Sequence, residues 1–222
     1  MSFEAESGFL EQVDGSSTFE FADTKVISSV AGPLEISRMK NEKATEAFLD
    51  INILPASGVS STRESLLESK LLSILSKVID VSQYPRKQIQ IVIQMVSPGE
   101  SQLYTVKELT AIVNSVYISL LNSGISLQTS FLATCCSISP SGDIITRPTA
   151  KQLESSRSHT ISVFSITDAA SDSLIYSDSE GTFTEEELLR VLDSCAEDIQ
   201  SMNEKVREVV HNRVKGDYIW HI

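Results

Sequence analysis

The chain has 222 residues, 41% of them hydrophobic, and a formal net charge of −12 at pH 7. Nucleic-acid binding draws most of its affinity from Lys and Arg contacts with phosphates, so this acidity excludes a strongly basic, autonomous nucleic-acid binder. No apolar run approaches the roughly 18 residues that a membrane span needs, and we predict no membrane contact. The acidic N-terminal segment also lacks the layout of a signal peptide.

The three cysteines point to packing roles in a reducing compartment. Cys135 and Cys136 are adjacent and Cys195 lies far away, so the spacing implies no disulfide framework. On a strand, alternation would send Cys135 and Cys136 to opposite faces. With no CxxC pair and no Cys/His cluster, we predict no zinc site.

The first part of the chain favours strands. Residues 15–21 and the β-branched run 24–30 flank a short turn, a pattern that predicts a hairpin. The polar stretch 37–45, which contains Lys40 and Lys43, predicts a solvated loop. A third strand is predicted at 48–54, where apolar and polar residues alternate up to Pro55.

Two helices with a strand between them follow. Ser61 and Glu64 form a capping box before apolar residues at three- and four-residue spacing, which predicts a helix that stops before Tyr84. Residues 88–94 alternate and predict a strand. A second helix is predicted from Thr105, with Glu108 as its box partner, to a stop at Gly124.

The second half predicts three strands, at 131–138, 160–166 and 173–177, the last two paired, and one long helix. Thr184 and Glu187 form the capping box of that helix. Its apolar stripe predicts a core face or a subunit contact; the stripe consists of Leu188, Leu192, Cys195, Ile199, Met202, Val206 and Val209. The apolar tail 218–222 would add an edge strand or pack on a partner. This order of elements predicts an α+β fold.

General motifs suggest no activity. His159 follows Ser158, yet the chain has no G-x-S-x-G elbow, so a Ser–His–acid triad is disfavoured. The acidic stretches 178–181 and 185–187 resemble a loose cation site, but they lack the ligand order of an EF-hand. The dipole of the long helix explains acids near its start.

Four motifs in order resemble the RNase PH family. They are the opening GSS, DTKVI and GPLE, the loop PASGVSSTRE, the helix end LLNSGI, and GTFT before the last helix. The resemblance covers nearly the whole chain and implies one α+β, RNase PH-like domain over 1–222, with mixed sheets and packed helices. The segments TRESLLESKL and YPRKQ most resemble a small ring subunit of the eukaryotic RNA exosome, as known from fungi.

Active members of this family attack an RNA 3′ end with phosphate, which requires cations for the phosphate and acids for a divalent metal. Here the resemblance places Lys107, Glu108 and Leu109 where the family has Gly-Thr-Arg, so the arginine is lost and Glu108 would repel phosphate. Arg63 roughly matches another phosphate-binding arginine. No acid occurs from 155 to 167, where the second metal carboxylate belongs.

The resemblance therefore implies a non-catalytic structural subunit, without metal or cofactor, that supports 3′-to-5′ RNA processing and degradation by helping to form an RNA-conducting channel. Its implied partners are other RNase PH-like ring subunits, RNA-binding cap subunits, a hydrolytic RNase II-type subunit and RNA, in the nucleus, nucleolus and cytoplasm. The alternative is a phosphorolytic or metal-dependent 3′-to-5′ exoribonuclease with a degenerate site.

Five cations are the candidates for RNA contact. They are Arg63, Arg86, Lys87, Lys40 and Lys43. A solvated surface charge, or a salt bridge to a neighbouring subunit, is the competing interpretation for each of them.

Overall fold

The computed structural model describes residues 3–21, 23–36, 42–167 and 170–217. In chain order the elements are β1 (Phe3–Ser7), β2 (Gly15–Phe21), β3 (Thr24–Glu35), β4 (Phe48–Leu54), α1 (Thr62–Val78), the short 3-10 helix η2 (Val81–Gln83), β5 (Lys87–Ser97), α2 (Val106–Ser123), β6 (Ser130–Ile138), β7 (Ile144–Thr146), α3 (Ala150–Glu154), β8 (Ser158–Thr167), β9 (Ala170–Gly181) and α4 (Glu185–Asp217).

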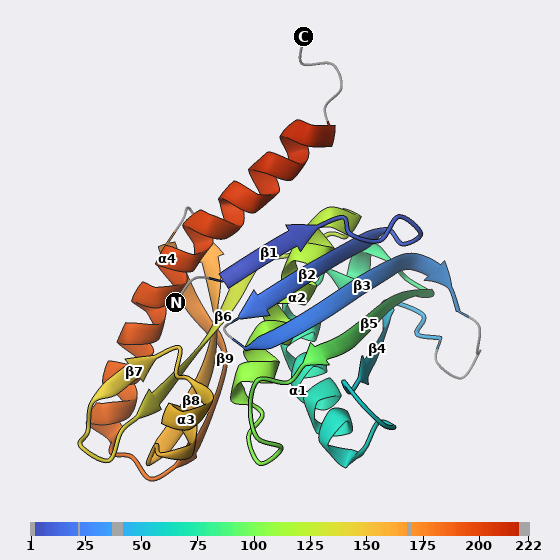
Figure 1. Ribbon diagram of the computed structural model, residues 1–222. Helices are drawn as coiled ribbons and strands as arrows, with labels where there is room; N and C mark the ends of the chain where they lie inside the picture. The colour runs from blue at the N-terminus through green and yellow to red at the C-terminus, as the bar shows by residue number, and fades with distance from the viewer. Residues whose placement is uncertain (1–2, 22, 37–41, 168–169, 218–222) are drawn as a thin grey trace.

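Two sheets organise the fold (Figure 1). The five-stranded sheet has the order β1-β2-β3-β5-β4, antiparallel except for the parallel pair β4 and β5. The antiparallel second sheet has the order β7-β6-β8-β9. The predicted α+β class with mixed sheets and packed helices is confirmed.

Helix α2 lies between the two sheets, contacting β2 and β3 on one side and β6 on the other. It is buried from Val106 through Leu120, because a sheet covers it on each side; the buried stretch includes the polar side chains of Lys107, Glu108 and Asn114. Ser115 and Ser119 of α2 meet Ser17 and Ser28 of the hairpin in a buried cluster of hydroxyls, with Oγ–Oγ distances of 2.5 to 3.1 Å. Gly15 permits this close approach, since a Cβ there would lie 2.1 Å from the Ser119 carbonyl oxygen.

Helix α4 packs along the second sheet and continues beyond it (Figure 1). Its predicted capping box is present, because the Thr184 N–H donates to Glu187 over 2.8 Å and the Glu187 N–H lies 3.4 Å from the Thr184 hydroxyl. The apolar stripe is buried at Cys195, Ile199, Met202 and Val206 and half-buried at Leu188, Leu192 and Val209. It is a core face, as predicted.

Cys135 and Cys136 do point to opposite faces of β6. Cys135 belongs to the main core beside α2, whereas Cys136 packs against α4 with its Sγ 3.0 Å from that of Cys195. All three cysteines are free thiols. No helix in the described ranges is both long and apolar enough to cross a membrane.

The sequence pattern did not predict the strands β1 and β7 or the short helix α3. Strand β1 alternates apolar and polar residues, but it is only five residues long and contains Glu4 and Glu6, which have a low strand propensity; the other two elements span only three and five residues. Residues 37–41, with Lys40, and the apolar tail 218–222 lie outside the described residues, so the expectations for them stay predictions.

Candidate functional site

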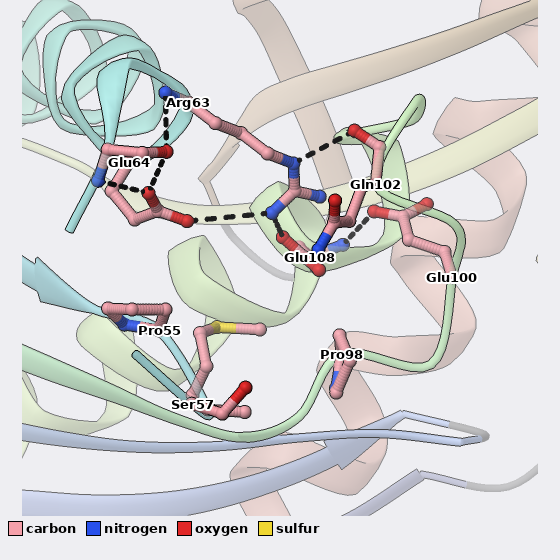
Figure 2. A pocket seen from close by; sticks show the side chains of 11 residues that line it. Pro55, Ser57, Arg63, Glu64, Pro98, Glu100, Gln102 and Glu108 are labelled. Atoms are coloured by element: carbon pink, nitrogen blue, oxygen red, sulfur yellow. Dashed lines mark hydrogen bonds and ion pairs between the residues drawn. The ribbon is translucent and has the colours of Figure 1, made fainter. Parts of the chain in front are cut away.

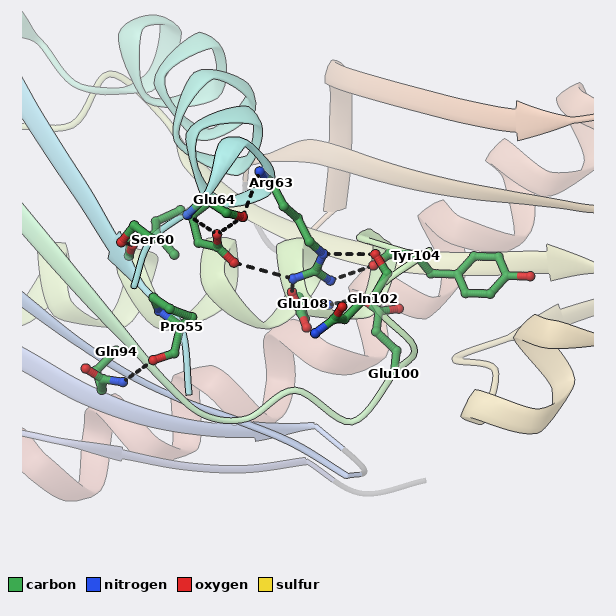
Figure 3. Close-up of polar contacts among 11 residues, drawn as sticks. Pro55, Ser60, Arg63, Glu64, Gln94, Glu100, Gln102, Tyr104 and Glu108 are labelled. Carbon is green, nitrogen blue, oxygen red and sulfur yellow. Dashed lines mark hydrogen bonds and ion pairs between the residues drawn. The ribbon is translucent and has the colours of Figure 1, made fainter. Parts of the chain in front are cut away.

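Arg63 projects from the first turn of α1 into a polar pocket (Figures 2 and 3). Ser61 caps this helix, and its hydroxyl and N–H both donate to the Glu64 carboxylate, over 2.6 and 2.7 Å. The predicted capping box at this helix is confirmed. Because the box fixes the first turn, it also fixes the direction in which Arg63 leaves the helix.

The guanidinium of Arg63 is bound on three sides by groups of the same chain. Its Nη1 lies 2.7 Å from Glu108 Oε2, its Nη2 donates to the Tyr104 carbonyl oxygen over 2.7 Å, and its Nε donates to the Gln102 carbonyl oxygen over 3.2 Å (Figure 3). Glu64 lies 3.9 Å from Nη1. Only 22% of the Arg63 side chain is exposed, and 1% of Glu108. The arginine therefore has little capacity left for an external anion.

The N-terminus of α2 is capped by Glu100, and the predicted Thr105–Glu108 box is wrong. The side chain of Thr105 accepts no capping hydrogen bond. Instead Glu100 accepts the N–H groups of Lys107 and Glu108 over 3.2 and 3.0 Å. Glu108 is turned toward Arg63, because a buried carboxylate gains more from a guanidinium than from a local cap.

The pocket is electrostatically unsuited to phosphate. It has a volume of about 180 Å³ and contains three carboxyl groups against one guanidinium. Burial raises the pKa of Glu108, with the adjacent Arg63 opposing the rise. Burial also raises the pKa of Glu100 to about 7, against the effect of the backbone N–H groups that it accepts. A phosphate would have to displace Glu100 from the helix terminus and Glu108 from Arg63.

His159 does not form a nucleophile–base pair with the serine beside it. Alternation along β8 sends Ser158 and His159 to opposite faces, and the buried Ser158 hydroxyl has no hydrogen-bond partner among the residues that the structure describes. The His159 ring instead meets Tyr104 edge-on at 5.3 Å and lies 3.4 Å from Glu180.

The acidic residues of the stretches 178–181 and 185–187, which resemble a loose cation site, are held in separate ion pairs. Within the described ranges no group of three or more His, Cys, Asp or Glu side chains is placed to hold a metal ion. The pairs that engage the acids are Lys70–Asp178 at 2.6 Å, His159–Glu180 at 3.4 Å and Arg157–Glu187 at 2.6 Å.

Among the described residues, the other predicted RNA contacts, Lys43, Arg86 and Lys87, lie at the opposite end of β5 from Arg63. Lys87 begins that strand and Arg86 precedes it, with the Arg86 N–H donating to the Lys43 carbonyl oxygen over 3.2 Å. The side chains of Lys43 and Arg86 are largely exposed and that of Lys87 is partly exposed; they pair loosely with Glu46, Glu42 and Glu35, at 3.3, 3.6 and 3.9 Å. The structure thus gathers these three cations and separates them from Arg63.

Sequence reasoning placed Arg63 and Glu108 in one site but missed Glu100, Gln102 and Tyr104. The carbonyl groups of Gln102 and Tyr104 have no signature in sequence, because any residue supplies a backbone oxygen. Glu100 follows a Pro-Gly turn, and it reaches α2 only because the loop folds back. Only the position of Glu100 just before a helix could have suggested its role.

Comparison with known proteins decides the family. A family model described as "3' exoribonuclease family, domain 1", RNase_PH, matches residues 2–126, more than half of the chain. The chain belongs to the RNase PH family. The resemblance drawn from sequence motifs is therefore confirmed.

Relatives within the RNase PH family cover almost the whole chain. Exosome complex component RRP46 of Saccharomyces cerevisiae is 35% identical, over 96% of this chain and 97% of the relative. Exosome complex component rrp46 of Schizosaccharomyces pombe is 28% identical, over 91% and 87%. The Exosome complex exonuclease RRP46 homolog of Arabidopsis thaliana is 26% identical, over 63% and 55%. The expected likeness to a small fungal ring subunit agrees with these matches.

A solved structure supports the RNase PH fold. The crystal structure of rice (Oryza sativa) Rrp46 superposes with a TM-score of 0.80, covering 96% of this chain and 94% of that chain. At 21% identity this likeness concerns the fold alone.

Proposed function

We propose that the chain is a non-catalytic structural subunit of the RNA exosome ring, which supports 3′-to-5′ RNA processing and degradation by helping to form the RNA-conducting channel. The observation that carries the proposal is the 2.7 Å ion pair between Arg63 and Glu108, in a pocket with two further carboxyl groups. The exosome component names of the two fungal relatives support the assembly.

Phosphorolysis requires a phosphate dianion to be held beside the RNA backbone, and cationic or N–H donors must offset the repulsion. Here the guanidinium of Arg63 forms an ion pair with Glu108 and donates to two carbonyl oxygens. The N–H groups at the start of α2 donate to Glu100. The groups that would bind phosphate are thus already bound by the protein itself.

We propose that one RNase PH-like unit takes in the whole chain, 1–222, since α2 joins the matched segment to the second sheet. Its proposed partners are other RNase PH-like ring subunits, RNA-binding cap subunits and a hydrolytic RNase II-type subunit, with RNA passing through the assembled channel. The proposed locations are the nucleus, nucleolus and cytoplasm. Copurification with measured stoichiometry tests these partners, and a chain recovered without ring subunits would contradict them.

RNA contact is proposed chiefly for the exposed cations Lys43, Arg86 and Lys87, with Lys40 from the preceding segment. Arg63 would contact RNA only by leaving Glu108. The test is RNA cross-linking in assembled rings that carry Arg86→Ala and Lys87→Ala, against Lys151→Ala and Arg190→Ala as the matched control pair. We expect weaker cross-linking only for the first pair; unchanged cross-linking contradicts the proposal.

The alternative is a degenerate exoribonuclease, favoured by the word "exonuclease" in the name of the Arabidopsis relative. The experiment incubates the purified chain with single-stranded RNA, phosphate and magnesium, alone and as Arg63→Ala, beside an active phosphorolytic RNase PH. We expect nucleoside diphosphates only from the active enzyme. Phosphate-dependent release by this chain, lost in an Arg63→Ala protein that circular dichroism shows to be folded, would establish the alternative.

A further inference from the structure

The outer edge of β4 forms one side of the five-stranded sheet. β4 pairs in parallel with β5 along Phe48–Leu54 and has no strand on its other side among the described residues. The chain returns from β4 through the 55–61 loop into α1, which packs beside this edge.

Both ends of this edge are closed by the chain itself. At one end the Ala47 N–H donates to the Val81 carbonyl oxygen over 2.9 Å. At the other end the Ile53 N–H donates to the Glu68 carboxylate over 2.9 Å, and the Ile53 carbonyl oxygen accepts the Ser60 hydroxyl over 3.1 Å. Side-chain capping of a strand edge is a common way to prevent unwanted pairing.

The middle of the edge is open. The N–H and C=O groups of successive residues point to alternate sides of a strand. Those of Leu49 and Ile51 therefore point to the same outer side as those of Ile53. Within the described part of the chain, no hydrogen-bond partner reaches these outward groups of Leu49 and Ile51. Two donors and two acceptors are thus presented with the spacing of a missing strand.

A groove of about 550 Å³ lies at the Leu49 end of the open stretch, between the start of β4 and α1. Its apolar lining includes Phe48, Leu49 and Leu72, with Leu72 43% exposed. The two charged side chains that line it, Lys43 and Glu46, pair with each other at 3.3 Å, which leaves the groove without a net charge.

We infer that the open edge of β4 and this groove bind an extended segment of a partner protein, which adds a short strand at Leu49–Ile51 and places an apolar side chain against Leu72. The backbone donors and acceptors select an extended peptide, and the groove supplies a pocket for its alternate side chains. RNA is disfavoured because Lys43, the one cation among the residues that line the groove, is offset there by Glu46, and because the unpaired groups of the edge are backbone donors and acceptors with the spacing of a peptide strand rather than of phosphates. The inference rests on the proposed function only in that the assembly supplies the partner.

Amide hydrogen exchange tests this inference, with the isolated chain compared with the chain in the purified assembly. In the isolated chain the amides of Leu49 and Ile51 should exchange at least about tenfold faster than those of Asp50 and Asn52, which bond to β5. In the assembly the Leu49 and Ile51 amides should slow at least about tenfold. The variant Leu72→Lys should abolish that protection, whereas Leu66→Lys, at an exposed leucine of α1 outside the groove, should retain it.

The variant Ile51→Pro removes one outward N–H and leaves the β5 ladder intact, so it should also prevent protection of Leu49. A chain that copurifies with the ring while Leu49 and Ile51 still exchange freely overturns this inference and leaves the proposed function standing. Failure to copurify contradicts both. If protection of the Leu49 and Ile51 amides in the isolated chain rises with the concentration of that chain, the edge binds a second copy. If these amides become protected when single-stranded RNA is added, the edge binds RNA. Either result overturns the inference.

Discussion

The cations near the two ends of β5 lie in opposite environments, one buried and the other exposed. At its end, Arg63 lies in a pocket against a carboxylate that is 1% exposed. At its start, Arg86 is 70% exposed and lies 3.6 Å from an acid that is itself exposed. The two groups are separated by roughly 33 Å of strand, at about 3.3 Å per residue.

This contrast separates a structural role for charge from a binding role. A buried ion pair with fixed geometry resists the loss of either partner, whereas an exposed pair contributes little and exchanges its partner readily. We therefore expect the Arg63 end to govern the stability of the chain and the Lys43–Arg86–Lys87 end to govern its contact with RNA.

The largest expected effect is that of Arg63→Ala on stability. Removing the guanidinium leaves Glu108 buried without its counter-charge, which should lower the free energy of unfolding by about 3 to 5 kcal/mol. Urea denaturation measures this change. The double variant Arg63→Ala with Glu108→Gln should recover part of the loss, and a loss below about 1 kcal/mol for the single variant would contradict a structural role.

A smaller effect is expected from pH. The pKa of Glu100 is raised from 4.5 to about 7, so the folded chain binds more protons than the unfolded chain between these values. The stabilisation is complete below pH 4.5 and is lost as pH rises toward 7, by roughly 1 to 3 kcal/mol. Unfolding measured at pH 5 and pH 8 should show this fall, and Glu100→Gln should flatten it. If the free energy of unfolding of Glu100→Gln falls as much between pH 5 and pH 8 as that of the unmodified chain, Glu100 is not the source of the pH dependence.

The capping box beside Arg63 should contribute less. Ser61→Ala removes the hydroxyl that donates to Glu64 and accepts the Arg63 N–H, and should cost about 1 kcal/mol. The hydroxyl of Ser76, exposed in the last turns of the same helix, provides the matched control, with an expected change below about 0.5 kcal/mol for Ser76→Ala. Equal losses of stability for Ser61→Ala and Ser76→Ala in thermal unfolding would contradict a stabilising role of this capping box.

The smallest effect on stability is expected at the start of β5. Arg86→Ala with Lys87→Ala removes two exposed, loosely paired cations and should change the free energy of unfolding by less than about 0.5 kcal/mol. Denaturation of the same protein used for RNA cross-linking checks this. A loss above about 1 kcal/mol would mean that the pair is structural, and that any loss of RNA contact is indirect.

Much of the fold follows from local sequence patterns. The hairpin β2–β3, the strands β4 and β5, the helix stop at Gly124 and the capping boxes of α1 and α4 all match the predictions. These features depend on alternation and on residues three apart, which a sequence displays directly. β1 was not predicted, although its side chains alternate between apolar and acidic, because the pattern covers only five residues and glutamate has a low strand propensity.

The candidate site was less predictable, because its contacts join distant segments. The motif comparison brought Arg63 and Glu108 to one site, and the repulsion of phosphate by Glu108 was expected. The capping role assigned to Glu108 was wrong because a tertiary partner, Arg63, outcompeted the local one. Glu100 took that role from a loop whose path no local pattern specifies.

The buried cluster of Ser17, Ser28, Ser115 and Ser119 implies strong non-additivity. Each hydroxyl carries one proton to donate, so the hydrogen bonds around the cluster must be oriented jointly. Replacing one serine by alanine would force the remaining three to reorient and leave an acceptor unmatched. A second replacement in the same cluster should therefore cost less than the first, so these four positions are expected to change together rather than one at a time.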